Sequence, residues 1–489
     1  MKKLLTRIGL VLVILLMLNW VYSKWFFEKD LRAHSDIVEL SWQVIDDSCR
    51  IIYVAESSNN HYGDEETNRR KISDYISDYF PTVKMGDLTK EASHAQTHYY
   101  LLKHIPKDAA VETVVETMNL RSFDAGWIYS DLETALRKQL VLLEGYPPLV
   151  NRFLLAFDAY PIKTKEEWNA LVMEHWKNDP LDFPYDFEWN NTRQWDSATA
   201  WRGWHDFDGN YDPKMTELAC HYIKSYGFRI TDDNPRVKDF DAIVKLCRER
   251  GWNLVFNLMA DNVDKANELV GKDLMYLMKQ NRDYLRNRYG NFEGVTVVDN
   301  LNLVRDVNFI DQNWTTEHYY EEGRRIVADH VAEALRSLYP NDYYDPDSLR
   351  YDVGHYCFGD EEQGLNDTAP YGPTAVLQKE DLSEEWGMLN VSFMMRQTDT
   401  LHKSRLVVQL LDDQSDMAAT YYSVKSQIQK LGQWDFATFA LPVDSTMRAA
   451  EQIKIFVYNP SGSTVWLKRM DVSFRPAYLK PRVKGQSIE

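Results

Sequence analysis

The sequence has few cysteines, and they stand far apart. The four thiols among the 489 residues are Cys49, Cys220, Cys247 and Cys357. No two of them have the short spacing of a zinc-binding pair, so we expect no metal and no cofactor. Cys247 lies on the apolar stripe of a predicted helix, so we expect it to be a small core residue. An oxidising compartment would nevertheless permit one disulfide.

Positive charge is also scarce. The chain has 56 Lys and Arg against 74 Asp and Glu, a formal net charge of −18. Such a surface repels phosphate groups, so we expect no nucleic-acid partner. An uncharged or cationic partner fits this charge better. The 15 Trp and 29 Tyr could hold the faces of sugar rings or simply fill cores.

The amino terminus carries a targeting signal. Basic residues precede the apolar run Ile8–Leu18, which is the pattern of either a cleaved signal peptide or a single membrane anchor. Bulky Trp20 and Trp25 stand where small cleavage-site residues are expected, and they suit an interfacial belt. We therefore expect residues 1–27 to be an uncleaved anchor, with the rest of the chain facing the periplasm or the cell exterior.

The length predicts two or three domains. Residues 28–340 alternate strand and helix patterns, which predicts an α/β domain whose parallel sheet is covered on both faces. The expected strands are Ile51–Val54, Thr82–Met85, Val111–Asn119, Trp252–Leu258 and Val295–Val298. The expected helices are Ile72–Phe80, Ser93–His104, residues 131–159, residues 235–250, Glu268–Tyr289 and Val327–Leu338.

A Trp-rich insertion interrupts this domain at about residues 160–215. Its tryptophans are interleaved with Pro, Asn and Gly, so we expect little regular structure. It could be a substrate-gripping lid, or a loop that its tryptophans fasten to the core.

The last domain, residues 341–478, reads as a β-sandwich similar to carbohydrate-binding modules, followed by a tail at 479–489. The expected strands are Leu389–Met395, Leu406–Leu411, Ala418–Val424, Trp434–Leu441, Ile453–Tyr458 and Val465–Phe474. Trp386, Trp434 and Trp466 are candidate sugar platforms, although the last two fall within strand patterns and could be core. Glycan binding and a purely structural or docking role both remain open for this domain.

Three polar residues follow strand patterns of the α/β domain. Ser57 comes directly after the first strand, Asn119 ends the third, and His318 lies in the loop after the last. In open α/β sheets, ligands bind at the carboxyl ends of the strands. We therefore expect these side chains to meet at one edge of the sheet.

Ser57, Gly86 after the second expected strand, Asn119, and His318 five residues before Gly323 together resemble the SGNH (GDSL-like) hydrolase superfamily. The resemblance covers roughly residues 50–339 and implies a flavodoxin-like α/β/α sandwich. It also implies that Ser57 is the nucleophile and His318 its base. The oxyanion donors would be the backbone N–H groups of Ser57 and Gly86 and the Asn119 side chain.

The sequence departs from the family pattern at three places. Gly-Asp-Ser is replaced by Ala55-Glu56-Ser57, and Asn119 is followed by Leu120 in place of Asp. The aspartate expected three residues before the histidine is Thr315. The acid that orients the imidazole is then Asp311, or else Glu317, or the site is a dyad.

These features predict a membrane-anchored serine esterase or O-acyltransferase that acts outside the cytoplasm on an acylated carbohydrate polymer. An anchor followed by such a domain is similar to accessory proteins of alginate O-acetylation and teichoic acid D-alanylation. That similarity implies a membrane acyl-donor transporter as a partner. The alternative is a catalytically inactive glycan-binding or scaffold protein that keeps the fold, and Thr315 is the feature that favours it.

Overall fold

A computed structural model describes residues 2–29, 41–42, 44, 48–64, 66, 68–130, 164–179, 181–343, 355–359, 361–382, 386–412, 415–425, 427–428 and 431–477. The chain forms two compact units. One comprises Met1–Glu66, Lys71–Ser73 and Lys84–Ala334, and the other comprises Thr67–Arg70, Asp74–Val83 and Leu335–Glu489. Most of helix α4 (Ile72–Asp78) thus falls in the second unit, although its sequence lies inside the expected α/β domain.

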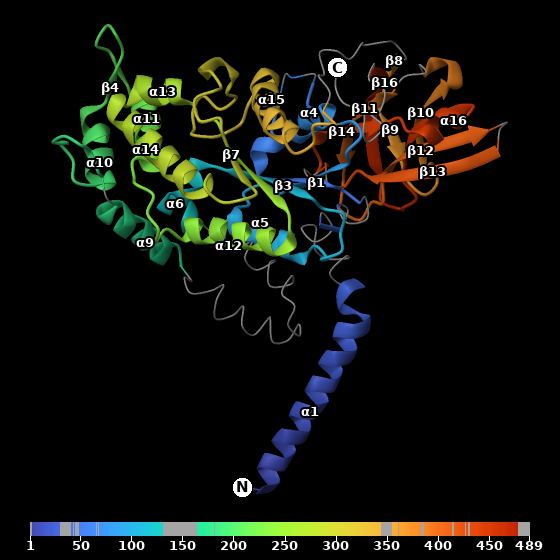
Figure 1. Cartoon of the computed structure of the whole chain (residues 1–489), viewed down its shortest axis with the longest axis horizontal. Coiled ribbons are helices and arrows are strands. Elements are labelled where there is room, and N and C mark those ends of the chain that lie inside the picture. The colour runs from blue at the N-terminus through green and yellow to red at the C-terminus, as the bar shows by residue number, and fades with distance from the viewer. Residues whose placement is uncertain are drawn as a thin grey trace. The chain divides into compact units, whose positions relative to one another are not determined.

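The first unit contains a five-stranded parallel sheet (Figure 1). Its strands are β1 (Ile51–Ala55), β2 (Met85–Thr89), β3 (Thr113–Met118), β6 (Asn253–Leu258) and β7 (Val295–Asp299). The spatial order is β2-β1-β3-β6-β7, so the direction of winding reverses between β1 and β3. Loops leaving the carboxyl ends of the strands diverge at such a reversal and create a binding crevice there. The expected parallel sheet is confirmed.

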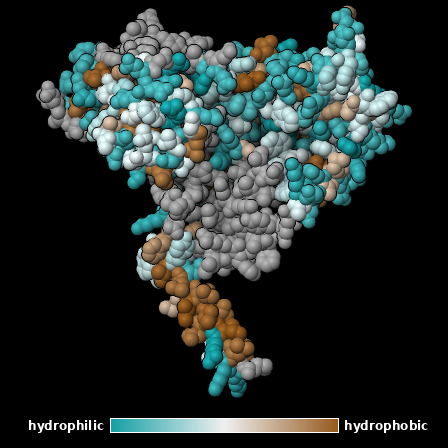
Figure 2. All heavy atoms as spheres, turned by 180° about the vertical axis from the view of Figure 1, so that it is seen from behind, coloured by the Kyte–Doolittle hydropathy of each residue, from teal (hydrophilic) through white to brown (hydrophobic). Residues whose placement is uncertain are grey.

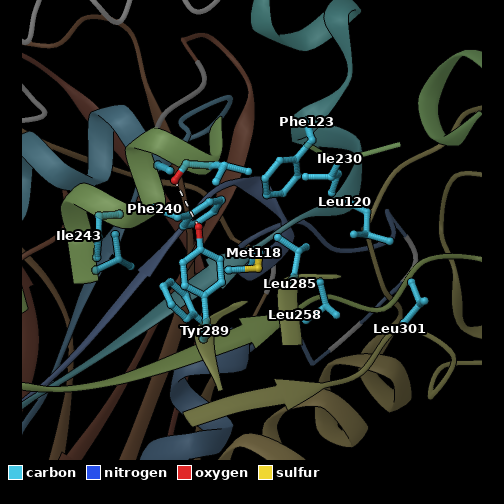
Figure 3. Close-up of a cluster of buried hydrophobic side chains, with 14 of the residues drawn as sticks. Met118, Leu120, Phe123, Ile230, Phe240, Ile243, Leu258, Leu285, Tyr289 and Leu301 are labelled. Carbon is cyan, nitrogen blue, oxygen red and sulfur yellow. Dashed lines mark hydrogen bonds between the residues drawn. The ribbon is translucent and has the colours of Figure 1, made fainter. Parts of the chain in front are cut away.

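Helices and strands of this unit enclose one apolar core, part of which Figure 3 shows. Every residue of β1 is fully buried, in keeping with its run of branched and aromatic side chains. The Tyr289 hydroxyl donates a hydrogen bond of 3.2 Å to the Val237 carbonyl, which satisfies its polar end inside the core. Cys247 is buried in this core as expected. Four of the expected helices are present as α5 (Ala95–His104), α12 (Pro235–Arg250), α14 (Lys272–Tyr289) and α15 (Glu321–Arg336).

Three expectations for this unit are wrong in detail. The helix expected from Glu268 is two helices, α13 (Val263–Leu269) and α14, because Gly271 adopts a φ of +96° between them. The second strand begins at Met85 and not at Thr82. Gly86 therefore lies inside the strand, where it pairs with Ile52.

The Trp-rich insertion is also more regular than expected. Its elements are α9 (Lys165–Asn178), α10 (Thr192–Arg202), a hairpin of β4 (Trp204–His205) and β5 (Tyr211–Asp212), and α11 (Pro213–Tyr226). Each helix has a side-chain cap at its amino terminus, from Thr164, Asn191 and Asp212 respectively. These caps outweigh the Pro and Gly residues that suggested a loop. The helix expected at residues 131–159 lies outside the described residues.

The second unit holds two antiparallel sheets, with strand orders β10-β15-β12-β13 and β14-β11-β16-β8, which enclose a separate apolar core. The strands are β8 (His355–Phe358), β9 (Gln363–Leu365), β10 (Tyr371–Gln378), β11 (Trp386–Gln397), β12 (Arg405–Asp412), β13 (Ser415–Ser423), β14 (Trp434–Pro442), β15 (Gln452–Tyr458) and β16 (Val465–Ala477). The six expected strands are present, whereas β8, β9 and β10 were not expected. The 479–489 tail lies outside the described residues.

The two candidate sugar platforms that the structure describes in this unit are engaged within it. The Arg396 guanidinium lies over the rings of both Trp434 and Trp466, and the Lys468 ammonium lies 4.2 Å from the Trp434 ring centre. Gly364 packs against the Trp466 ring. These cation–π contacts account for both tryptophans as parts of the sheet surface. The side chain of Trp386 lies outside the described residues.

Helix α1 (Lys2–Trp25) is long and apolar enough to cross a membrane. Its side chains form the brown segment of Figure 2. A membrane anchor and a signal sequence both have these properties.

Candidate active site

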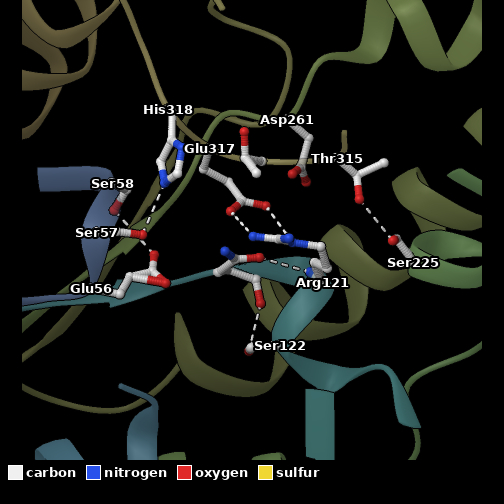
Figure 4. Close-up of polar contacts among 12 residues, drawn as sticks. Glu56, Ser57, Ser58, Arg121, Ser122, Ser225, Asp261, Thr315, Glu317 and His318 are labelled. Atoms are coloured by element: carbon white, nitrogen blue, oxygen red, sulfur yellow. Dashed lines mark hydrogen bonds and ion pairs between the residues drawn. The ribbon is translucent and has the colours of Figure 1, made fainter. Parts of the chain in front are cut away.

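Ser57 lies two residues after the end of β1, as the first residue of the short helix η1 (Ser57–Asn59). Its Oγ lies 2.9 Å from Nε2 of His318, which belongs to the loop before α15 (Figure 4). Nδ1 of the same imidazole lies 2.7 Å from a carboxylate oxygen of Asp311. The structure thus joins Ser57, His318 and Asp311 in one chain of contacts, across 261 residues between the serine and the histidine.

The charge of Asp311 determines which nitrogen of a neutral His318 carries the proton. The hydrogen bond with His318 lowers the pKa of Asp311 to about 2, and the Thr316 hydroxyl, which donates to the same carboxylate, contributes to the lowering. An ionised Asp311 accepts a hydrogen bond from the Nδ1–H group, so in a neutral imidazole Nε2 carries a lone pair. That lone pair faces Ser57 and can accept the hydroxyl proton.

Thr315, which stands at the acid position of the family pattern, and Glu317, the other candidate acid, both make contacts elsewhere. The Thr315 hydroxyl lies 2.9 Å from that of Ser225 on α11 and is buried. The Glu317 carboxylate accepts hydrogen bonds from Arg121 at 2.8 and 3.2 Å. Asp311 therefore supplies the carboxylate that orients His318, from seven residues upstream.

Asn119 lies at the carboxyl end of β3, next to β1. Val54 pairs with Glu116, so the register places Asn119 at the level of Ser57. Its Oδ1 accepts the N–H of Arg121, and its backbone carbonyl accepts the Ser122 hydroxyl. These bonds hold the amide in place and use its oxygen, which leaves the Nδ2 hydrogens as donors for a ligand.

Gly86 does not reach this edge of the sheet. It pairs with Ile52, three residues before the end of β1, and a Cβ on it would lie 2.7 Å from Val44 Cγ2 and 3.0 Å from Cys49 Sγ. The small residue is therefore required by packing, and the oxyanion role expected for it does not fit. At the end of β2, the Lys90 N–H donates to the Ala55 carbonyl at 2.9 Å.

Two candidate oxyanion donors remain among the residues that the structure describes. Ser57 is the first residue of η1, and the first N–H groups of a helix have no partner within it. The second donor is the Asn119 amide. The sequence predicted both donors. The third predicted donor, the N–H of Gly86, lies inside β2, and the N–H of Lys90 at the end of β2 is already bonded to Ala55.

The turn that carries Ser57 is anchored by Asn59, which the sequence analysis did not single out. This side chain is fully buried. Its Nδ2 lies 2.7–3.1 Å from oxygens of Ser73, Asp87 and Thr89, which share its two hydrogens, and its Oδ1 accepts the Ser73 N–H at 2.9 Å. A short polar residue in a turn gives no sequence signal of such contacts.

Two buried arginines fix the backbone on either side of His318. Arg121 pairs with Glu317, the residue before it. Arg324 donates to the carbonyl of Tyr319, the residue after it, at 2.6 Å and also pairs with Glu66. Charged groups at buried positions are costly unless paired, so both pairs hold their loops firmly.

An excess of carboxylates surrounds the Arg121–Glu317 pair (Figure 4). Burial and the Glu317 charge raise the pKa of Glu56 to about 7. Burial and Glu317 also raise the pKa of Asp261 well above its usual range, while Tyr226 donates to its Oδ1 at 2.7 Å. The buried Oδ2 of Asp261 has no hydrogen-bond partner among the described residues, in keeping with a carboxyl group whose neutral form burial favours.

A second Ser–His–carboxylate set lies deeper in the unit. Ser93 Oγ lies 2.7 Å from Nε2 of His98, whose Nδ1 lies 2.6 Å from Glu116. At most 2% of each residue is exposed, so a substrate cannot reach them. Ser93 also donates to the Lys90 carbonyl, which makes the set a brace for the turn after β2.

His61, Asp311 and His318 are the group in the described chain whose ligand atoms, all within 4.8 Å of one another, could hold a metal. The rings of His61 and His318 stack, with centres 3.9 Å apart and planes at 21°. Imidazole binds a metal through lone pairs in the ring plane, so two stacked rings cannot both point at one ion. In this arrangement His318 contacts Ser57, and the stacked rings of His61 and His318 do not suit a metal ion.

No protein family and no curated protein matches this sequence. Among solved structures, the chain is similar to the VP2 subviral particle of infectious bursal disease virus, with 10% identity over 27% of this chain and 33% of that one and a TM-score of 0.21. It is also similar to tailspike protein 4 of bacteriophage CBA120, with 12% identity over 26% and 19% of the two chains and a TM-score of 0.18. A CBM4 structure is matched with 15% identity over 26% and 77% of the chains and a TM-score of 0.16. The chain spans about a third of the capsid protein, and likenesses this low carry no argument about its fold or function.

Proposed function

We propose that this protein is a serine esterase or O-acyltransferase that acts on acyl groups of a carbohydrate polymer outside the cytoplasm. The single observation that carries the proposal is the contact chain from Ser57 through His318 to Asp311 at the point where the sheet's winding reverses. A serine, an imidazole and a carboxylate in this order are what nucleophilic acyl transfer requires. The strand order and the motif order are similar to those of SGNH hydrolases.

In the proposed reaction, His318 Nε2 takes the Ser57 proton as Oγ attacks the acyl carbonyl. Asp311 stabilises the imidazolium that forms. The Ser57 N–H and the Asn119 amide stabilise the oxyanion, and the imidazolium then protonates the leaving alcohol. In the second half, His318 activates either water or a sugar hydroxyl, which releases the acyl group from Ser57.

The rival reading, an inactive scaffold, depended on the loss of an acid at Thr315. Asp311 contacts His318 where an acid at position 315 is missing, and this contact supports an active enzyme over the rival. The apolar helix α1 supports a location at a membrane. The proposed substrate, a carbohydrate polymer, would lie at the outer face of that membrane.

The test is the turnover of aryl acetates by the detergent-solubilised full-length protein. We expect release of the aryl alcohol by the wild type and a loss of at least about a thousandfold in Ser57→Ala. Ser58→Ala is the matched control, since Ser58 is buried beside Ser57 and bonds Glu56. Equal turnover by Ser57→Ala and the wild type would show that another group is the nucleophile.

A further inference from the structure

Trp314 is an exposed aromatic side chain in the same loop as the triad acid and base. About half of it, 49%, is accessible to solvent. The Ile310 N–H donates to the His318 carbonyl at 3.0 Å, and Phe309 pairs with Tyr319, so the loop is closed at its base. Asp311 and His318 stand at the two ends of this loop, and Trp314 stands near its tip.

The tip is held in place by α11. The Thr315 hydroxyl bonds Ser225, and the Trp314 ring packs on the ring of His221, with centres 3.9 Å apart and planes at 51°. His221 and Ser225 are four residues apart and share one face of the helix. The indole is therefore both exposed and fixed, which lowers the entropic cost of binding a ligand on it.

Chain geometry limits its distance from the reacting atoms. Trp314 is the third residue after Asp311, so their Cα atoms are at most about 10 Å apart. A ligand on the indole face is thus within the length of a short oligosaccharide from Ser57. An alcohol that leaves or attacks the acyl group on Ser57 would come from this neighbourhood.

The charges around the ring do not select an anion. Burial lowers the pKa of His221, which favours the neutral imidazole, and a Glu217 carboxylate oxygen lies 3.8 Å from its Nε2. Lys224, the nearby cation on α11, lies 3.9 Å from Asp196. An uncharged, flat ligand with an apolar face and a polar rim suits an indole in polar surroundings.

We infer that Trp314 is a binding platform for a neutral pyranose ring of the polymer, next to the unit that carries or receives the acyl group. This inference rests on the proposed function and adds the substrate class to it. The platform holds the sugar, while Ser57, His318 and Asp311 act on the acyl group. Thr315, which departs from the family pattern, gains a role in fixing the platform to α11.

The test measures binding separately from catalysis. Full-length Ser57→Ala protein is titrated by calorimetry with a panel of neutral oligosaccharides made of glucose, xylose, mannose and N-acetylglucosamine. We expect one class to bind, with affinity reduced roughly tenfold by Trp314→Ala and less by Trp314→Phe. Trp201→Ala is the matched control, because Trp201 is 86% exposed on α10 and should leave binding unchanged.

Three outcomes would overturn the inference: no binding by any member of the panel, equal binding by the Trp314→Ala protein, or an equal loss in the Trp201→Ala protein. Aryl esters would reveal a fourth such outcome. If Trp314→Ala lowers the turnover of aryl butyrate in protein that retains Ser57, but leaves sugar binding unchanged, the ring contacts the acyl chain and not a sugar. The proposed function fails by a different result, namely aryl acetate turnover that does not depend on Ser57. Circular dichroism checks that each variant is folded.

Discussion

Asp311 accepts a hydrogen bond of 2.7 Å from Nδ1 of His318, which lies seven positions later in the chain. The family pattern places the acid three residues before the histidine, and here that position, Thr315, faces α11. The longer spacing makes room for a loop whose tip carries Trp314. The acid and the candidate sugar platform thus lie in the same loop.

The first prediction concerns this acid. Asp311→Asn keeps the size of the side chain but removes the charge that stabilises the imidazolium, so we expect kcat for aryl acetate to fall by about 10³–10⁴. Steady-state kinetics of the folded variant measure it. Thr315→Val is the control and should lower kcat by less than tenfold. A loss of less than tenfold in Asp311→Asn would mean that Ser57 and His318 act as a dyad.

The second prediction distinguishes packing from catalysis at Gly86. A methyl group here meets Val44 and Cys49, so Gly86→Ala should lower the free energy of unfolding by about 1–3 kcal/mol. Its kcat per folded molecule should match that of the wild type. Gly359→Ala, where no heavy atom lies within 4 Å of the added carbon, is the control for thermal unfolding. A stable Gly86→Ala protein with greatly reduced kcat would show that Gly86 contributes to the oxyanion site after all.

The third prediction concerns the Asn119 amide. Asn119→Asp retains an oxygen for the Arg121 N–H but loses the donor, so the loop should keep its shape while kcat falls by about 10²–10³. Thermal unfolding and aryl acetate kinetics are measured together. An Asn119→Asp protein with wild-type kcat would show that the oxyanion is stabilised by other donors.

The fourth prediction is a pH dependence of stability. Glu56 has a pKa of about 7 in the folded protein, above its usual value, so the folded state binds the extra proton between about pH 4.5 and 7. Stability from this group is therefore lost as pH rises through that window, by about 3 kcal/mol at most. Glu56→Gln should flatten the fall in melting temperature between pH 5 and 8. An unchanged slope would show that Glu56 is ionised throughout.

Much of this architecture could be predicted from the sequence, because strands such as β1 are runs of apolar residues and alternate with helices. Gly86 was misplaced because Thr82-Val83 looks like a strand, whereas the strand starts at Met85. The regularity of the insertion was missed because its Pro and Gly residues were weighed above the helix caps. The Arg121–Glu317 pair joins residues 196 apart, and no local pattern reveals such a contact.

The central claim is that His318 activates Ser57, and labelling with a fluorophosphonate probe tests it most directly. The probe reacts with serines whose hydroxyl is activated by a neighbouring base. We predict labelling of the folded wild type at neutral pH, no labelling of Ser57→Ala or His318→Ala, and unchanged labelling of Ser93→Ala, whose serine is buried beside His98. A well-folded wild type that takes up no probe, or a Ser57→Ala protein that labels like the wild type, would contradict this account.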